Sequence, residues 1–210
     1  MRKIFALAAI TATLFSCSND DDNSAPAEEA FFNFEIGDTW AYKHYSQNSE
    51  GTFIFNSVID TVKIVGTQEF YGETYFDFET KTYGTGGNLS DTNHTYQRVD
   101  ENGHLINSRG RIVSPGNDTD FTDNYPYTMA NNDTIGYMAT QLFQQQDIEV
   151  EGQSYSAYNY QSYFTPVANG GAAGIGYQTF FSPGIGLVLR RYRYLNSEGL
   201  KIEYRLVYHN

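Results

Sequence analysis

Residues 201–209 read KIEYRLVYH, and this segment decides the fold. Ile202, Tyr204, Leu206 and Tyr208 take every second position, and mostly charged side chains stand between them. Because successive side chains of a β-strand point to opposite faces, the alternation predicts a half-buried strand of an antiparallel sheet.

The same alternation recurs along the chain from about residue 31. Trp40, Tyr42 and His44 are expected to share one face of the first strand. The chain contains 18 tyrosines and 15 phenylalanines, residue types that favour strands. We expect strands near 39–47, 52–66, 73–83, 92–99, 103–113, 147–151, 153–164, 175–181, 185–195 and 200–208.

Short turns separate these segments. The tetrapeptide Asn-Ser-Glu-Gly occurs at 48–51 and again at 196–199, and a close relative stands at 100–103. Each ends in a glycine that can take a positive φ, as in a type I turn followed by a bulge. Tyr71-Gly72 and Glu151-Gly152 indicate two further hairpins.

Evidence for helix is thin. Residues 137–146 are the one candidate for a short helix, while 114–133 and 169–174 have the composition of loops. Connections this short leave no room for helical crossovers, so neighbouring strands are expected to be antiparallel. The sequence predicts an all-β domain with little helix: a single curved antiparallel sheet or half-barrel, or a β-sandwich.

The first 16 residues have the form of a secretory signal, with two positive charges followed by an apolar run too short to span a bilayer. Leu14-Phe15-Ser16-Cys17 resembles the bacterial lipobox. The resemblance implies cleavage before Cys17 and lipid on its sulfur, because several acyl chains anchor a protein stably. As the sole cysteine of the chain, Cys17 leaves no partner for an intramolecular disulfide.

Residues 17–30 are polar and acidic and are expected to form a flexible tether. Asp20-Asp21-Asp22 resembles the signal that exports Bacteroidetes lipoproteins to the outer face of the outer membrane. The resemblance implies a cell-surface protein, and the periplasmic leaflet is the alternative. The chain is thus divided into a signal (1–16), a lipidated tether (17–30) and one β domain (31–210).

The net charge of −12 argues against nucleic acid as a partner, because phosphate backbones repel an acidic surface. The membrane, reached through lipid on Cys17, is the expected partner. A glycan or an envelope protein is a further possible partner.

Three short motifs carry a family resemblance: GDTWAY at 37–42, VEGQSY at 150–155 and SPGIGLV at 182–188. In this order they resemble uncharacterised Bacteroidetes lipoproteins of the flavobacterial type with an all-β domain. The resemblance implies the fold and the anchor and brings no established activity.

The candidate binding residues form an aromatic run: Tyr155, Tyr158, Tyr160, Tyr163 and Phe164. In a strand, Tyr158, Tyr160 and Phe164 share one face, and the other two take the opposite face. Tyrosine offers apolar area and a hydroxyl, which suits stacking on a sugar or a protein partner. Cross-strand pairing within a solvated sheet is the structural alternative.

Other motifs give little chemistry. Thr61 and Thr134 lie in Asp-Thr-Val and Asp-Thr-Ile triplets that resemble O-glycosylation acceptors of exported Bacteroidetes proteins. No nucleophile elbow, zinc-protease motif or metal-spaced histidine pair is present, so we expect no enzymatic activity, cofactor or metal site.

The leading hypothesis is therefore a non-enzymatic binding module of the cell envelope that recognises a glycan or a protein. The alternative is a carrier or sensor that holds an apolar ligand in the concavity of a curved sheet, which predicts a cavity of several hundred cubic ångströms. A hydrolase of envelope polymers is the third hypothesis, because a carboxylate pair assembled by folding leaves no signature in sequence.

Overall fold

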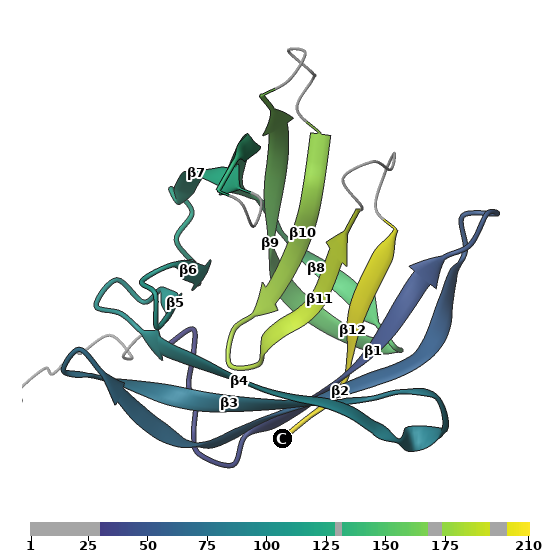
Figure 1. Cartoon of the computed structure of the whole chain (residues 1–210), viewed down its shortest axis with the longest axis horizontal. Coiled ribbons are helices and arrows are strands. Elements are labelled where there is room, and N and C mark those ends of the chain that lie inside the picture. The colour runs from purple at the N-terminus through teal and green to yellow at the C-terminus, as the bar shows by residue number, and fades with distance from the viewer. Residues whose placement is uncertain (1–29, 129–131, 168–173, 194–200) are drawn as a thin grey trace, which may run out of the picture.

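The computed structural model describes residues 30–128, 132–167, 174–193 and 201–210. The expected signal, Cys17, tether residues 17–29, the turn at 196–199 and most of the loop 169–174 lie outside the described residues. Twelve strands form one antiparallel sheet in the order β6-β5-β4-β3-β2-β1-β12-β11-β10-β9-β8-β7 (Figure 1). Their bounds are β1 Thr39–Gln47, β2 Phe53–Phe70, β3 Glu73–Tyr83, β4 Leu89–Val99, β5 Leu105–Asn107, β6 Ile112–Ser114, β7 Thr122–Thr128, β8 Thr134–Val150, β9 Gln153–Pro166, β10 Gly174–Ser182, β11 Gly186–Tyr192 and β12 Ile202–His209, with one 3₁₀ turn, η1, at Thr85–Gly87.

The sheet consists of two runs of six strands. Strands β1 to β6 follow one another outward to one edge, and β7 to β12 return from the other edge to the centre. The alternating segment that ends the chain is β12, and it pairs with β1 on one side and with β11 on the other. Tyr204 lies opposite His44 of β1 and opposite Arg190 of β11. The strand predicted there is confirmed, and it joins the two runs.

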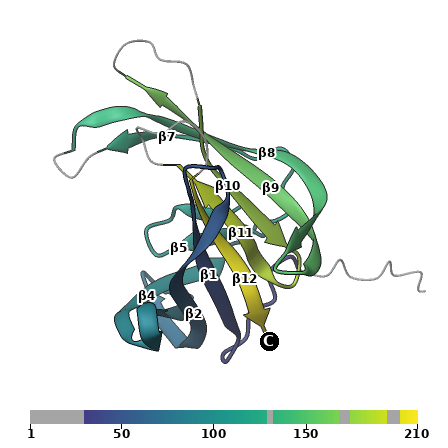
Figure 2. The same cartoon turned by 90° about the vertical axis from the view of Figure 1, so that its right-hand side faces the viewer.

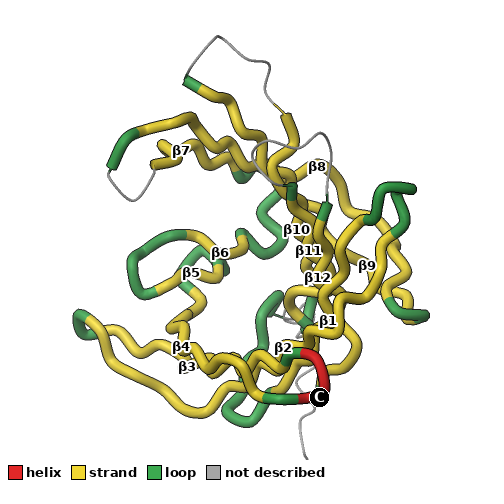
Figure 3. Tube along the Cα trace, turned by 45° about the vertical axis from the view of Figure 1, so that its right-hand side comes forward, coloured by secondary structure: helices red, strands yellow, loops and turns green. Residues whose placement is uncertain are grey.

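The sheet is open and strongly curved. Figure 3 shows its C-shaped course, with β5 and β6 turned into the inside of the curve. Register shifts interrupt the ladders of β1 with β12, β2 with β3 and β8 with β9, among others. Such bulges increase local twist and bend a strand. The expectation of a curved sheet or half-barrel is confirmed, and the β-sandwich is excluded.

Aromatic residues that precede β1 fill part of the concave side. Phe34 packs edge-on against Phe78 at 5.4 Å, and Phe32 packs against Phe181 of β10 at 6.3 Å between ring centroids. Phe31 packs against Tyr158 at 5.3 Å. Residues 31–34 therefore connect the two runs of strands through buried rings on the inside of the curve.

The β8–β9 hairpin covers part of the outer side. Figure 2 shows it bending towards β12, and Val150 near its tip is buried in one core cluster with Leu189. Val188 and Leu189 are neighbours whose side chains point to opposite faces, yet they are only 0% and 4% exposed. The centre of the sheet is thus buried on both faces.

A chain of ion pairs fastens this hairpin to the outer face. Glu203 is 1% exposed and accepts hydrogen bonds from Nε of Arg191 at 2.6 Å and Nε of Arg205 at 2.7 Å. Arg205 continues to Glu151 at the hairpin tip, 3.3 Å away, and the Tyr45 hydroxyl donates to Glu151 at 2.7 Å.

The hairpin contact depends on the charge of Glu151. Burial raises the pKa of this carboxyl, but hydrogen bonds from Tyr45, then from Arg205, outweigh burial, so the pKa lies below its ordinary value. A lowered pKa in the folded state means that the contact stabilises the fold above the ordinary carboxyl pKa. The stabilisation is lost as the pH falls through the lowered value.

The described turns confirm the predicted hairpins. Gly51 and Gly103 have φ of +84° and +80°, as their turn type requires. At the two-residue turns 71–72 and 151–152, both residues of each pair have positive φ. This is the geometry of the tight hairpin turn that matches strand twist.

Three expectations are wrong in detail. Residues 137–146 are not helical but lie within β8, because pairing with β9 along its whole length overrides their weak local preference. The strand expected at 103–113 is split by a turn in which Asn107 accepts backbone hydrogen bonds from Arg109 and Arg111. The loop expected at 114–133 contains β7.

Replacing Glu203 by alanine is expected to lower the free energy of unfolding by about 3 kcal/mol, since both arginines lose their partner carboxylate. The estimate is at the low end for a buried pair, because the Arg191 side chain is 38% exposed and regains water. Urea unfolding measures the change. Glu149→Ala, at an exposed position of β8, serves as the control with an expected change within about 0.5 kcal/mol. Equal effects of the two variants would contradict the central role of Glu203.

A candidate ligand-binding cavity

The concave side contains a cavity of about 530 Å³. Strands β7 to β12 form one wall, and the segment from β6 to β7 forms the other. Its lining residues are Ile112, Val113, Pro115, Phe121, Asp123, Tyr125, Tyr127, Met138, Thr140, Tyr160, Ser162, Phe164, Gly176, Tyr177, Thr179, Arg190, Tyr192, Arg193 and Tyr204. The volume falls within the range of small-molecule sites.

Strand register explains why these side chains meet. One cross-strand row runs from Tyr160 through Thr179 and Arg190 to Tyr204. Residues directly opposite one another in an antiparallel ladder point to the same face, so all four face the concavity. The row also shows that four different strands each supply one of these side chains.

A second row follows two residues along the strands. It runs from Asp123 through Thr140, Ser162 and Tyr177 to Tyr192. The hydroxyl groups of Thr140 and Ser162 lie 2.6 Å apart and bond to each other. Every second residue of these strands thus faces the cavity, and its lining mixes polar and aromatic side chains.

Tyrosine hydroxyl groups give the cavity hydrogen-bonding capacity. The hydroxyls of Tyr125 and Tyr177 are 2.7 Å apart, and those of Tyr192 and Tyr204 are 3.1 Å apart. Burial, followed by the hydrogen bond to Tyr177, raises the pKa of Tyr125 above its usual value. The phenol groups can offer hydrogen-bond donors and acceptors to a ligand.

Gly176 leaves room in the cavity wall for the side chain of Met138. A Cβ atom on Gly176 would lie 2.8 Å from Cε of Met138, so the end of the Met138 side chain would have to move. Because Gly176 sits at a register shift between β9 and β10, its backbone approaches Met138 directly. Met138 is 4% exposed and closes the cavity at this point.

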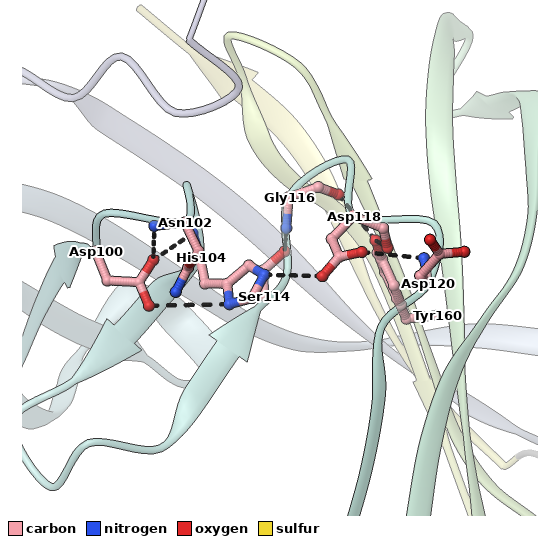
Figure 4. A network of polar contacts seen from close by, with 8 residues as sticks. All are labelled: Asp100, Asn102, His104, Ser114, Gly116, Asp118, Asp120 and Tyr160. Carbon is pink, nitrogen blue, oxygen red and sulfur yellow. Dashed lines mark hydrogen bonds and ion pairs between the residues drawn. The ribbon is translucent and has the colours of Figure 1, made fainter.

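The segment between β6 and β7 is held over the cavity by a polar network (Figure 4). His104 contacts Asp118 at 3.1 Å through Nε2, and its Nδ1 lies 3.8 Å from Asp100. The hydroxyl of Tyr160 donates to the backbone carbonyls of Gly116 at 3.0 Å and Asp118 at 3.1 Å. Tyr160 therefore both lines the cavity and fixes its opposite wall.

The structure divides the predicted aromatic run. Tyr160 and Phe164 line the cavity, whereas Tyr158 belongs to the core cluster beside Phe31. Tyr155 packs against the core cluster that contains Val150 and Leu189. The Tyr163 hydroxyl donates to Oε1 of Gln161 at 2.7 Å. Most cavity residues missing from the prediction lie on strands other than β9, and Ser162 of β9 is missing as well.

The predicted glycosylation threonines differ in their surroundings. Thr61 lies half-buried within β2, with its hydroxyl 3.5 Å from the carbonyl of Lys81. Thr134 is exposed at the start of β8. Of the two threonines, Thr134 is the more exposed.

Three histidines pair with aspartates. His44 contacts Asp60 at 2.8 Å, and His94 contacts Asp77 at 2.7 Å, in addition to the pair at His104 described above. Within the described ranges, no group of three or more potential ligands is placed to hold a metal ion. No helix in the described part of the chain is long and apolar enough to cross a membrane.

Two solved structures share the fold. A candidate lipoprotein of Parabacteroides distasonis matches with a TM-score of 0.50, and a candidate exported protein of Bacteroides fragilis with a YmcC-like fold matches with 0.53. Each is 12% identical in sequence, and each match covers 87% of this chain and 99% of the other. No protein-family model and no curated protein matches the chain. The similarity supports the curved-sheet fold alone.

Replacing Tyr160 by phenylalanine is expected to cost about 1–2 kcal/mol in unfolding free energy, because two backbone carbonyls lose their donor. Amide exchange at Asp118 and Asp120 should accelerate, since the wall segment loses its attachment to Tyr160 and keeps only that to His104. Hydrogen-exchange mass spectrometry measures this effect. Tyr163→Phe, the same change on the outer face of β9, is the control and should leave exchange at 118–120 unaltered. Equal acceleration in both variants would contradict the attachment.

Proposed function

We propose that this chain is a lipid-anchored exported binding protein that holds a small, partly apolar ligand in its concave cavity. The single observation that carries the proposal is the cavity of about 530 Å³, lined by tyrosine and phenylalanine rings from β7, β9, β10, β11 and β12 and from Phe121 before β7. A carrier or sensor of an apolar ligand is the alternative hypothesis from the sequence, and that hypothesis requires a cavity of this size. It also suits a small glycan, which needs aromatic faces and hydroxyl partners.

The contrast between the two halves of the concave side supports this proposal. Phe34 packs against Trp40, Phe76 and Phe78 in the half formed by β1 to β4, where a cavity of only about 160 Å³ remains. In the half formed by β7 to β12, Phe31 and Phe32 pack against Tyr158 and Phe181, and neither Phe31 nor Phe32 lines the larger cavity. The larger cavity therefore lies in one half of the sheet only, and well-packed residues border it.

The binding proposal predicts that Thr179→Trp abolishes ligand uptake, because Thr179 lies in the middle of the lining and an indole fills the space. Fluorescence titration with the neutral dye N-phenyl-1-naphthylamine measures uptake, and at least a tenfold loss of affinity is expected. Thr92→Trp adds the same ring at an exposed position of β4 and is the control. Equal dye affinity in both variants, or turnover of an envelope polymer by the wild-type protein, would contradict the proposal.

We propose further that the protein belongs to the Bacteroidetes surface lipoproteins, with lipid on Cys17 and the acidic segment 20–22 directing it to the cell surface. The lipobox resemblance and the acidic cluster support this location. The retained alternative is the periplasmic leaflet of the outer membrane.

The location is tested with Cys17→Ser and with protease treatment of intact cells. The variant is expected to leave the membrane fraction, since it has no site for lipid. The wild-type β domain is expected to be cleaved on intact cells. Membrane retention of Cys17→Ser would contradict the anchor, and protection of the wild-type domain until the outer membrane is permeabilised would contradict surface display.

A further inference from the structure

The cavity holds two arginines that have no carboxylate partner. Arg190 and Arg193 both line it, and neither forms an ion pair or a hydrogen bond through its side chain within the described ranges. Asp123 is the only carboxylate among the described lining residues, and it forms no ion pair with either arginine. Two permanent positive charges therefore face the same partly buried space.

This arrangement stands out in an acidic chain. The sequence has 25 acidic and 13 basic side chains, so carboxylates are in excess. Arg191, the neighbour of Arg190 that points to the outer face, is paired with Glu203 at 2.6 Å, and Arg98 lies 3.7 Å from Glu73. Placing unpaired cations in a half-buried site costs free energy unless an anion arrives to pair with them.

The backbone places both guanidinium groups where a ligand can reach them. Arg190 stands between Thr179 and Tyr204 in the first cross-strand row, and it borders both the large and the small cavity. Arg193 follows the end of β11, and its backbone N–H donates to the carbonyl of Gly176 at 3.1 Å.

The position of Arg193 depends on a glycine. A Cβ atom on Gly174 would lie 2.8 Å and 2.9 Å from the two terminal nitrogens of Arg193. The guanidinium therefore lies directly over the backbone of Gly174, where any side chain would displace it.

We propose that the ligand of this cavity carries an oxyanion, a carboxylate, sulfonate or phosphate ester, that binds to Arg190 and Arg193. The planar guanidinium fork matches the geometry of such groups. Its apolar body then packs among the rings of residues such as Tyr160, Phe164 and Tyr177. The inference rests on the proposed function of the cavity and names the chemical class of its ligand.

A free inorganic anion fits the site less well than an amphipathic acid. A cavity of about 530 Å³ is many times larger than such an ion. An inorganic anion would leave the aromatic rings of the lining without a contact. The rings and the two charges together favour a ligand with both an acidic head and an apolar body.

Two dyes that differ by one acidic group test the inference. N-phenyl-1-naphthylamine is neutral, and 8-anilino-1-naphthalenesulfonate adds a sulfonate to the same ring system. The wild-type protein is expected to bind the sulfonate about tenfold more tightly than the neutral dye, the effect of one or two charge-assisted hydrogen bonds. Added sodium chloride should weaken only the sulfonate, because salt screens the charge interaction.

The variants Arg190→Gln and Arg190→Gln with Arg193→Gln isolate the two charges. Affinity for the sulfonate should fall about tenfold or more, whereas affinity for the neutral dye should change less than twofold, which also shows that the cavity is intact. Arg109→Gln removes an exposed arginine and is the charge-matched control. It should change neither affinity.

The outcomes separate the two proposals. If neither dye binds the wild-type protein, or if Thr179→Trp leaves binding unchanged, the cavity proposal fails. If both dyes bind equally and the arginine variants do not distinguish them, the oxyanion is disproved while the cavity stands. Inorganic phosphate is expected not to displace the sulfonate dye; displacement by phosphate alone would overturn the amphipathic class in favour of a free anion.

Discussion

Strand β12 hydrogen-bonds to β1 along one side and to β11 along the other, and no other strand pairing joins the two runs among the described residues. A shift of one residue in β12 would turn Leu206 out of the core and Glu203 into it. Glu203 is held on the outer face by Arg191 and Arg205, so the ion pairs specify the register as well as the hairpin contact. Because β1 and β12 come from opposite ends of the described chain, this pairing closes a long loop and is expected to form late in folding.

The pairing of β12 with β1 joins the two runs into one curved sheet. The segment before β1 supplies aromatic side chains to its concave side. Phe34 brings aromatic area to the half formed by β1 to β4, where it packs against Trp40 and Phe78. In the other half, the wall segment around Asp118 is attached through Tyr160 and His104 instead of being packed down. The same curved sheet therefore has a packed half and a half that retains space. Arg190 borders both cavities and stands at the boundary between them.

The sequence predicts much of this fold because alternation and turns are local properties. The faces assigned to Trp40 and Tyr42 and the positive-φ turns follow from period and residue type. The set of residues that line the cavity could not be predicted, because residues such as Tyr125 and Tyr204 come to line one cavity only through the curvature and through strand order. Residues 137–146 show the same limit, since their strand depends on pairing with β9 and not on their own composition.

The composition of the cavity lining favours the binding role proposed for it. An enclosed, dry void of about 530 Å³ would cost on the order of 13 kcal/mol at roughly 24 cal/mol per Å³, but this cavity opens to solvent and does not carry that cost. An open cavity instead presents polar groups that solvent or a ligand can satisfy. The tyrosine hydroxyls, Thr140 and Ser162 supply these groups, and the two arginines add charge where packing alone would favour leucine or phenylalanine. The lining is thus chemically costly for a structural core and suited to a site that a ligand occupies.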